Sequence, residues 1–197
     1  MSVLLKKIKT KDARIGVIGL GYVGLPLALE FARSGYNVTG IDKNRERVES
    51  LKKGKSYIID VTDSEVKQLI KTGRFNVTDD ASVLSKLDAV IICVPTPLTK
   101  TKDPDVSYII SVSQEIKNYM HKGQLFVLES TTYPGTTEEL VLPILEEGGL
   151  KVGRDFFLAF SPERIDPGNK QYSVRNIPKV IGGVTRHCTE LARCMYS

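Results

Sequence analysis

Residues 15–42 read IGVIGLGYVGLPLALEFARSGYNVTGID, with Gly19, Gly21 and Gly24 in the spacing GxGxxG. A strand that turns directly into a helix needs each of these glycines for a different steric reason. The first allows the tight turn, the second lets the backbone touch a pyrophosphate, and the third lets the helix pack closely on the strand. The spacing therefore predicts a turn that binds a dinucleotide such as a nicotinamide or flavin cofactor.

The residues on both sides of this turn have the patterns that such a site requires. Arg14–Ile18 is a short apolar, β-branched run that predicts a strand, and Tyr22–Ser34 has apolar residues at helical spacing. Val38–Ile41 predicts a second strand, and Asp42 follows it at about the offset expected for the acid that binds an adenosine ribose. The alternative is a domain of the same fold that binds another ligand, such as a methyl donor, or none.

Composition limits the protein to a few classes. The chain has 197 residues, of which 41% are hydrophobic and 26% charged, which suits one globular domain or a domain with a short appendage. No apolar run approaches the roughly 20 residues of a membrane span, and the N-terminus has no signal-peptide core. We therefore expect a cytoplasmic protein with no membrane partner.

Cysteines, histidines and lysines give no sign of other chemistry. The three cysteines form no CxxC pair, which favours a reducing compartment, and the two histidines have no partner at ligand spacing, so we predict no metal site. The net charge of +5 is modest. The basic cluster Lys6, Lys7, Lys9 and Lys11 lies in residues 1–13, which we interpret as a frayed, solvated N-terminal arm. We predict no nucleic-acid partner, with binding by this cluster as the alternative.

Beyond Asp42 the chain alternates predicted helices and strands without repeats. Further helices are predicted at Asn44–Lys53, Ser64–Lys71, Val106–Met120, about 138–146 and the C-terminal segment, and further strands at Ala89–Val94, Leu125–Leu128, Phe156–Phe160 and Lys179–Ile181. This alternation predicts a doubly wound α/β fold of the Rossmann type, with a mostly parallel sheet, right-handed crossovers and helices on both faces. We assign residues 14–197 to this domain.

Polar residues gather where the predicted strands end, which is where open parallel sheets bind ligands. Thr96, Ser130–Thr132 and residues 161–169 join the glycine turn and Asp42 there. Their hydroxyl groups can hydrogen-bond a ribose, a pyrophosphate or a water without adding a charge, although such residues also make turns. Their occurrence at the ends of different strands favours a binding site.

Five segments carry a resemblance to a known family: Gly19–Pro26, Cys93–Leu98, Glu129–Thr137, Phe160–Asn169 and Ile177–Gly183. In this order they resemble the amino-terminal half of the UDP-glucose/GDP-mannose dehydrogenase family, over the chain from about residue 14 to its last residue. The runs PTPLTK, LESTTYPGTTEE and SPERIDPGN are most similar to the UDP-N-acetylglucosamine 6-dehydrogenase branch. The resemblance implies oxidation of the C6 alcohol of a nucleotide sugar to a carboxylate, with two NAD and a cysteine thioester that water hydrolyses.

The resemblance also implies a role for each residue of the predicted cofactor site. Backbone N–H groups at the start of the helix would bind the pyrophosphate of NAD, because they and the helix dipole favour an anion. Asp42 would bind the adenosine ribose and repel the 2′-phosphate of NADP, so NAD is the expected cofactor, and Arg47 would lie beside the adenine or the phosphates. The predicted cofactor-binding residues are Gly19, Gly21, Tyr22, Val23, Gly24, Asp42, Arg47, Thr96 and Thr131.

Catalytic and substrate-binding residues are implied in the same way. Thr131 resembles the family's threonine on the catalytic water. Glu163 matches the glutamate that takes a proton from the water attacking the thioester. Arg164 and Ile165 match positions that contact the sugar nucleotide. Thr131 and Glu163 are thus the predicted catalytic residues, and Arg164 and Ile165 the predicted substrate-binding residues.

The chain departs from the family pattern in two ways. Pro167 stands where the UDP-glucose branch has a second glutamate, which argues against UDP-glucose as the substrate. The family's nucleophilic cysteine, its long helix with a lysine and an asparagine, and its UDP-gripping domain have no counterpart in the sequence. Cys93 ends a buried strand and is expected to be inert, and Cys188 and Cys194 lie in a helical segment without a His or Asn partner. We therefore expect a chain that is truncated before the central helix and is inactive alone.

Three hypotheses remain open. The first is the cofactor domain of a nucleotide-sugar 6-dehydrogenase acting on a UDP-N-acetylhexosamine, with UDP-N-acetylglucosamine expected and UDP-N-acetylmannosamine or UDP-glucose as alternatives. The second is a dehydrogenase of the β-hydroxyacid type, which requires a catalytic lysine on a following helix that the sequence does not supply. The third is a non-enzymatic NAD-binding module. For the first we expect a UDP-sugar as substrate, a role in polysaccharide biosynthesis and a homo-oligomeric full-length enzyme.

Overall fold

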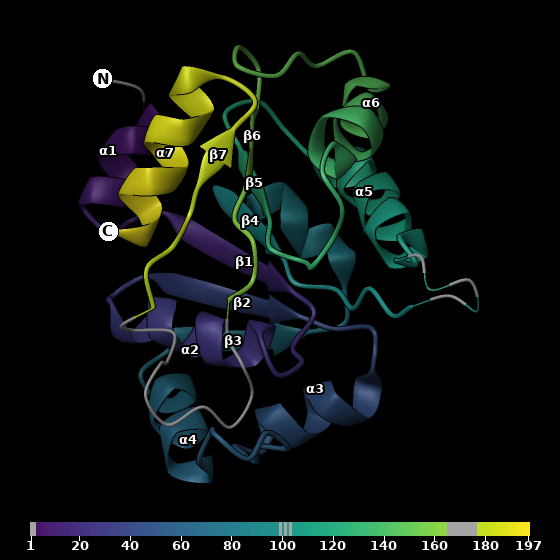
Figure 1. The fold of residues 1–197 in the computed structure, drawn as a ribbon. Helices are drawn as coiled ribbons and strands as arrows, with labels where there is room; N and C mark the ends of the chain where they lie inside the picture. Colours follow the sequence, from purple (N-terminus) through teal and green to yellow (C-terminus); the bar gives the residue numbers. More distant parts are fainter. Residues whose placement is uncertain (1–2, 99, 101, 103, 165–176) are drawn as a thin grey trace.

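The computed structural model describes residues 3–98, 100, 102, 104–164 and 177–197. They form a seven-stranded sheet of order β3-β2-β1-β4-β5-β6-β7 (Figure 1). The strands are β1 (Arg14–Ile18), β2 (Asn37–Ile41), β3 (Phe75–Thr78), β4 (Ala89–Ile92), β5 (Leu125–Leu128), β6 (Phe157–Phe160) and β7 (Gly182–Gly183). Strands β1 to β6 pair in parallel, and β7 pairs antiparallel to β6. The predicted doubly wound, mostly parallel α/β fold is confirmed.

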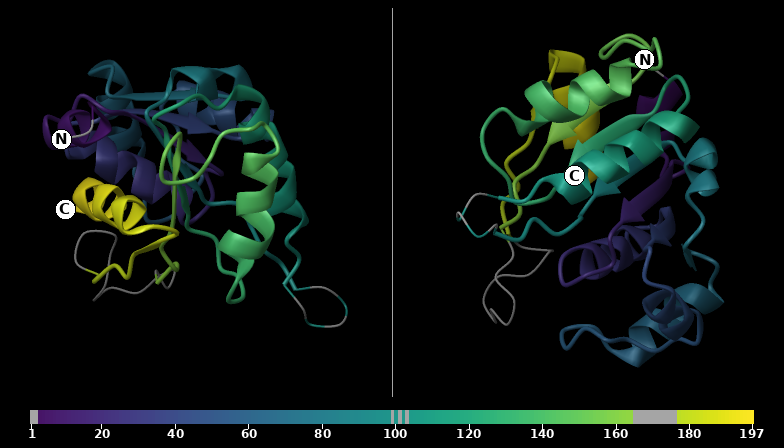
Figure 2. Two further views of the ribbon diagram at one scale, coloured as in Figure 1. Left: turned by 90° about the horizontal axis from the view of Figure 1, so that it is seen from above. Right: turned by 90° about the vertical axis from the view of Figure 1, so that its right-hand side faces the viewer.

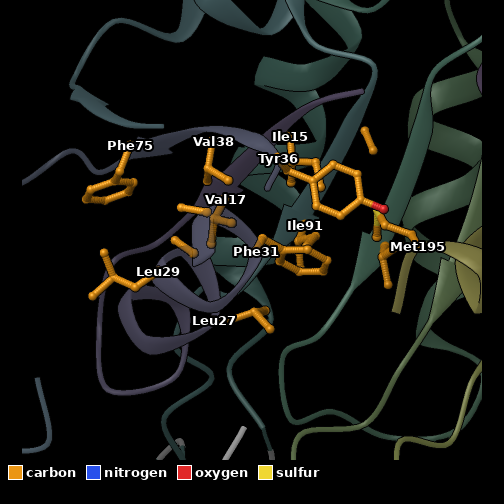
Figure 3. Packing of buried hydrophobic residues seen from close by; sticks show 14 of the residues in the cluster. Ile15, Val17, Leu27, Leu29, Phe31, Tyr36, Val38, Phe75, Ile91 and Met195 are labelled. Atoms are coloured by element: carbon orange, nitrogen blue, oxygen red, sulfur yellow. The ribbon is translucent and has the colours of Figure 1, made fainter. Parts of the chain in front are cut away.

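One face of the sheet is covered by five helices, whose buried residues form a single cluster with that face. They are α1 (Val3–Lys9), α2 (Gly24–Arg33), α3 (Arg45–Lys52), α4 (Asp63–Lys71) and α7 (Arg186–Tyr196). Successive side chains of a strand point to opposite faces, so Ile15 and Val17 of β1 both face this layer. Figure 3 shows them packed with Leu27 and Phe31 of α2. This packing fixes α2 against β1 and thereby the turn between them.

The other face is covered by α5 (Ser107–Tyr119), α6 (Leu142–Glu146), a 3₁₀-helix η1 (Ala81–Lys86) and a π-helix η2 (Thr136–Val141). Figure 2 shows α5 and α6 on the opposite side of the sheet from α1 and α7. The strand residues of the opposite register, such as Ile92 and Leu128, are fully buried in this second cluster. Burial on both faces explains why the central strands read as continuous apolar runs.

Side-chain caps set where the helices begin. Asn44 accepts a hydrogen bond from the Arg47 N–H (3.1 Å) at the start of α3. Thr62 and Glu65 form a capping box at the start of α4, with reciprocal bonds of 3.3 and 2.9 Å. Because this cap lies two residues after Asp42, the first turn of α3 brings Arg47 close to that carboxylate.

The N-terminal segment differs from its prediction. Residues 3–9 form the helix α1, with Leu4 and Ile8 buried among residues of α7 and the sheet. The Lys7 ammonium donates to Asp88 (2.6 Å) at the start of β4. The prediction of a frayed, solvated arm is therefore wrong for these residues, because a seven-residue helix shows too little periodicity to be recognised among four lysines.

Three other segments differ in detail. The last strand is β7 at Gly182–Gly183 rather than at Lys179–Ile181, and Lys179 instead forms an ion pair with the buried Glu129. The edge strand β3 was not anticipated, although Phe75 and Val77 alternate with the exposed Asn76. The helix predicted at about 138–146 begins earlier, as η2, and continues as α6. None of the helices in the described residues is long and apolar enough to span a membrane.

Candidate functional site

A cavity of about 670 Å³ opens at the carboxyl ends of β1, β2, β4 and β5. The strand order reverses between the neighbouring strands β1 and β4, which is the point where doubly wound sheets bind ligands. The volume falls within the range of small-molecule sites. The sequence-predicted residues that line the cavity are Gly19, Gly21, Tyr22, Val23, Asp42, Arg47, Thr96, Thr131 and Glu163.

The three glycines of the turn have three different surroundings. Gly19 has φ +90°, and a Cβ on it would lie 2.5 Å from the Cys93 carbonyl oxygen. A Cβ on Gly24 would overlap the Gly19 carbonyl oxygen, whereas a Cβ on Gly21 would meet no atom within 4 Å. Gly24 does not line the cavity and serves close packing of α2 on the turn. Gly21 leaves open space at the cavity wall, as close approach of a ligand requires.

The turn presents unused hydrogen-bond donors. Within the described part of the chain, the backbone N–H groups of Gly21, Tyr22 and Val23 donate to no other group. They lie at the start of α2, where the helix dipole adds a partial positive charge. Free N–H groups and a dipole at one helix terminus make a site for an anion such as a pyrophosphate.

Asp42 lies at the cavity with its side chain nearly buried. Its Oδ2 accepts the Leu20 N–H (2.9 Å), and its Oδ1 accepts the Asn44 N–H (2.8 Å). The Arg47 guanidinium lies 3.6 Å from Oδ2. Each carboxylate oxygen can accept a further hydrogen bond, so two acceptors are still available for the two hydroxyl groups of a ribose. The two backbone bonds hold the carboxylate in one orientation.

The hydroxyl residues tie together the loops that follow β4 and β5. Thr96 Oγ1 donates to the Thr131 carbonyl (2.5 Å), and Ser130 Oγ donates to the Val94 carbonyl (2.7 Å). These bonds place the Thr131 side chain, which is exposed, at the wall of the cavity.

The segment after β6 brings Glu163 to the same cavity. Its Oε1 accepts the Arg164 N–H (2.6 Å). The Arg164 guanidinium donates to the Pro178 carbonyl (3.1 Å) and does not line this cavity. Ile165 and Pro167 lie outside the described residues. Of the predicted catalytic and substrate residues, the structure thus brings Thr131 and Glu163 together at the cofactor cavity.

A buried charged cluster beside this cavity was missed by sequence reasoning. Glu129, at the end of β5, accepts a hydrogen bond from the Tyr196 hydroxyl (2.6 Å) and forms an ion pair with Lys179. Burial lowers the pKa of Lys179 to about 8, and the carboxylate beside it favours its charged form. Burial also raises the pKa of Cys93, which lines the cavity, to about 12, so that its thiol stays protonated.

One feature of the sequence could have indicated this cluster. Glu129 follows directly after the buried run Leu125–Leu128, and a carboxylate in that position needs a partner. Nothing local identifies that partner, because Tyr196 is 67 positions away and Lys179 lies in an irregular segment. The described residues include no group of three or more His, Cys, Asp or Glu side chains that could hold a metal ion.

The cavity combines the two features that bind a dinucleotide, which are the N–H donors at the start of α2 and the carboxylate that follows β2. The chain is therefore a dinucleotide-binding domain of the Rossmann type. Residues 13–197 match the NAD-binding domain of the UDP-glucose/GDP-mannose dehydrogenase family, and the chain belongs to this family. The cofactor of this domain is accordingly NAD, and the open Gly21 and the free N–H groups fit its pyrophosphate.

Curated relatives match more than nine-tenths of the chain. The chain is 40% identical over 188 residues to the UDP-N-acetyl-D-glucosamine 6-dehydrogenase of Pseudomonas aeruginosa, covering 94% of this chain and 43% of that protein. It is 39% identical over 184 residues to the UDP-N-acetyl-D-mannosamine dehydrogenase of Pyrococcus horikoshii, covering 93% of this chain and 44% of that protein. The chain thus spans less than half the length of these relatives.

Solved structures of nucleotide-sugar dehydrogenases also resemble this chain. The NDP-N-acetyl-D-galactosaminuronic acid dehydrogenase of Methanosarcina mazei superposes with a TM-score of 0.88 at 36% identity, over 100% of this chain and 44% of that one. A ternary complex of the GDP-mannose dehydrogenase of Pseudomonas aeruginosa superposes with a TM-score of 0.86 at 31% identity, over 93% and 44%. The chain shares the fold of nucleotide-sugar dehydrogenase cofactor domains.

Proposed function

We propose that this chain is the cofactor domain of an enzyme that oxidises the C6 alcohol of a UDP-N-acetylhexosamine, UDP-N-acetylglucosamine first, to the uronic acid with two NAD. The observation that carries the proposal is that Thr131 and Glu163 line the same cavity as the glycine turn and Asp42. A hydroxyl that can hold a water and a carboxylate that can take its proton are the groups that the hydrolysis step needs. The relative that acts on UDP-N-acetyl-D-glucosamine, at 40% identity, supports this substrate.

Each residue of the cavity has a proposed task. The free N–H groups of the turn bind the pyrophosphate, Asp42 binds the adenosine ribose, and Arg47 lies beside the adenine or the phosphates. NAD held there would supply the oxidant for the C6 alcohol of the sugar. Thr131 holds a water, and Glu163 takes a proton from it. We further propose that Arg164 and Ile165 contact the sugar nucleotide.

The setting of the full-length enzyme is also proposed. All three cysteines are free, which supports a reducing, cytoplasmic compartment. We propose a homo-oligomeric full-length enzyme that acts in polysaccharide biosynthesis without nucleic-acid or membrane partners.

Asp42→Ala should weaken NAD binding by roughly 1.5 to 3 kcal/mol, the range for hydrogen bonds to a charged group. The unaltered chain should bind NAD more tightly than NADP, because the carboxylate repels a 2′-phosphate. Calorimetry with both cofactors measures this. Asp42→Asn is the matched control, since it keeps an acceptor oxygen but removes the charge, and it should narrow the difference between NAD and NADP. Equal or tighter NADP binding by the unaltered chain, or unchanged NAD affinity in Asp42→Ala, would contradict the role of Asp42.

The 197-residue chain should bind NAD but produce no NADH from UDP-N-acetylglucosamine. The covalent intermediate needs a thiolate, and the chain offers none that is ready to react. Cys93 has its pKa raised to about 12 by burial, and Cys188 and Cys194, both in α7, do not line the cavity. Absorbance of NADH against a blank without enzyme measures turnover. NADH formation that disappears on Cys93→Ser or Cys188→Ser would show that the chain carries its own nucleophile.

The full-length enzyme should have a higher kcat/KM for UDP-N-acetylglucosamine than for UDP-glucose. Pro167 stands where the UDP-glucose branch has a second glutamate, so a long charged side chain is replaced by a residue with a fixed φ. The ratio of kcat/KM values reports the difference in transition-state binding. A preference for UDP-glucose or GDP-mannose would refute the substrate, and a preference for UDP-N-acetylmannosamine would move it to the other epimer. No oxidation of any nucleotide sugar would favour the non-enzymatic module.

A further inference from the structure

Tyr57 connects the two ends of the cofactor site from outside the cavity. It lies in the segment between α3 and α4, and its hydroxyl donates to the Leu20 carbonyl (2.7 Å), between Gly19 and Gly21. Its ring lies under the Arg47 guanidinium, 5.5 Å from the ring centroid to Cζ. One side chain thus contacts the pyrophosphate turn and the arginine at the adenosine end.

The hydroxyl determines which way one peptide of the turn faces. Leu20 is held at both ends, because its N–H donates to Asp42 (2.9 Å) and its carbonyl accepts from Tyr57. In a trans peptide the carbonyl of one residue and the N–H of the next point in opposite directions. Holding the Leu20 carbonyl on Tyr57 therefore turns the Gly21 N–H away from Tyr57. That N–H has no partner in the described part of the chain, and Gly21 lines the cavity.

The ring restrains Arg47. This side chain is 46% exposed and would otherwise sample many rotamers, so its single long contact with Asp42 (3.6 Å) is weak by itself. An aromatic face below the guanidinium adds a cation–π attraction and removes much of that freedom. Burial raises the pKa of Tyr57 well above its usual value, so the hydroxyl remains a donor.

We propose that Tyr57 is a positioning residue for NAD binding, which aims the Gly21 N–H at the pyrophosphate and holds Arg47 at the adenosine end. The inference rests on the proposed roles of the turn and of Arg47. This role differs from that of a purely structural anchor, because the Tyr57 hydroxyl acts on the pyrophosphate end of the ligand and the Tyr57 ring acts on the adenosine end.

The test compares two ligands in two variants. Tyr57→Phe removes the bond to Leu20 and keeps the ring, so the Kd for NAD should rise about 2- to 12-fold while the Kd for adenosine, which lacks the pyrophosphate, stays the same. Tyr57→Leu also frees Arg47, so both Kd values should rise. Calorimetry measures NAD binding, ligand-observed NMR measures adenosine binding, and thermal unfolding is followed in every variant.

Tyr36→Phe is the matched control. Tyr36 is buried beyond the C-terminal end of α2 and does not line the cavity. Its hydroxyl donates to the Ile8 carbonyl (3.1 Å) and accepts from the Lys11 ammonium (3.1 Å), so this variant loses a buried tyrosine bond without touching the site. Its Kd for NAD should be unchanged. Equal NAD affinity in Tyr57→Phe and the unaltered chain, or equal losses for NAD and adenosine in Tyr57→Phe, would overturn the proposal. If the unaltered chain itself failed to bind NAD, the cofactor assignment would fall, and the role of Tyr57 with it.

Discussion

Gly21→Ala should raise the Kd for NAD by about 10- to 150-fold, the equivalent of one lost hydrogen bond to a charged group, and leave the thermal midpoint unchanged. The added methyl meets no protein atom within 4 Å, and Gly21 has no left-handed φ, so the fold tolerates alanine. The same methyl occupies the open space at the cavity wall through which a pyrophosphate must approach the backbone.

Gly24→Ala, unlike Gly21→Ala, should destabilise the fold, by about 3 kcal/mol. Its Cβ would overlap the backbone carbonyl of Gly19, and no side-chain rotation can relieve a contact with main chain. Either α2 or the turn must move, so NAD binding should be lost along with stability. Denaturant unfolding and calorimetry on the same samples separate the two effects.

Gly182→Ala is the control for both glycine variants. A Cβ there also meets nothing within 4 Å, but Gly182 lies on β7 and does not line the cavity. It should alter neither stability nor NAD affinity. If Gly21→Ala bound NAD as well as this control does, the turn would not approach the pyrophosphate at Gly21, and the role of the glycine motif in this chain would need revision.

The helices and strands that the sequence predicts correctly are those with a periodic pattern of apolar residues within the element itself. The strand at Arg14–Ile18 and the helix after it follow from local periodicity, and Asp42 follows from its distance along the chain. The exceptions are short or depend on contacts distant in sequence. The seven residues of α1 form a helix because Leu4 and Ile8 are buried against α7, which lies at the other end of the sequence.

The site shows the same division. Spacing placed Gly19, Gly21 and Asp42 at the cavity, whereas Gly24 packs α2 on the turn and does not line it. Spacing did not predict that the Asp42 carboxylate is already held by the N–H groups of Leu20 and Asn44. It also gave no indication of Tyr57, which reaches the turn from a segment with no motif of its own. Long-range side-chain contacts decide how the site is oriented, and they leave no period in the sequence.

Lys179→Met should destabilise the chain by about 3 to 5 kcal/mol, because it leaves a buried carboxylate without its cation. The Glu129 side chain is 0% exposed and Lys179 is 11% exposed, so water cannot replace the lost partner. The Tyr196 hydroxyl remains as a neutral donor to Glu129, which compensates for only part of the charge. The change should appear as a lower denaturant midpoint with an unchanged m-value.

Two further variants separate this ion pair from a general effect of removing a lysine. Lys117→Met breaks an ion pair of 2.6 Å with Glu147, which is 60% exposed, and should cost less than about 1 kcal/mol. The double variant Lys179→Met with Glu129→Gln removes both charges and keeps an acceptor for Tyr196, so it should recover most of the stability that Lys179→Met alone loses. Equal losses in the single and double variants would mean that Glu129 does not depend on Lys179, because the cost would then lie in packing rather than in an unpaired charge next to the cofactor cavity.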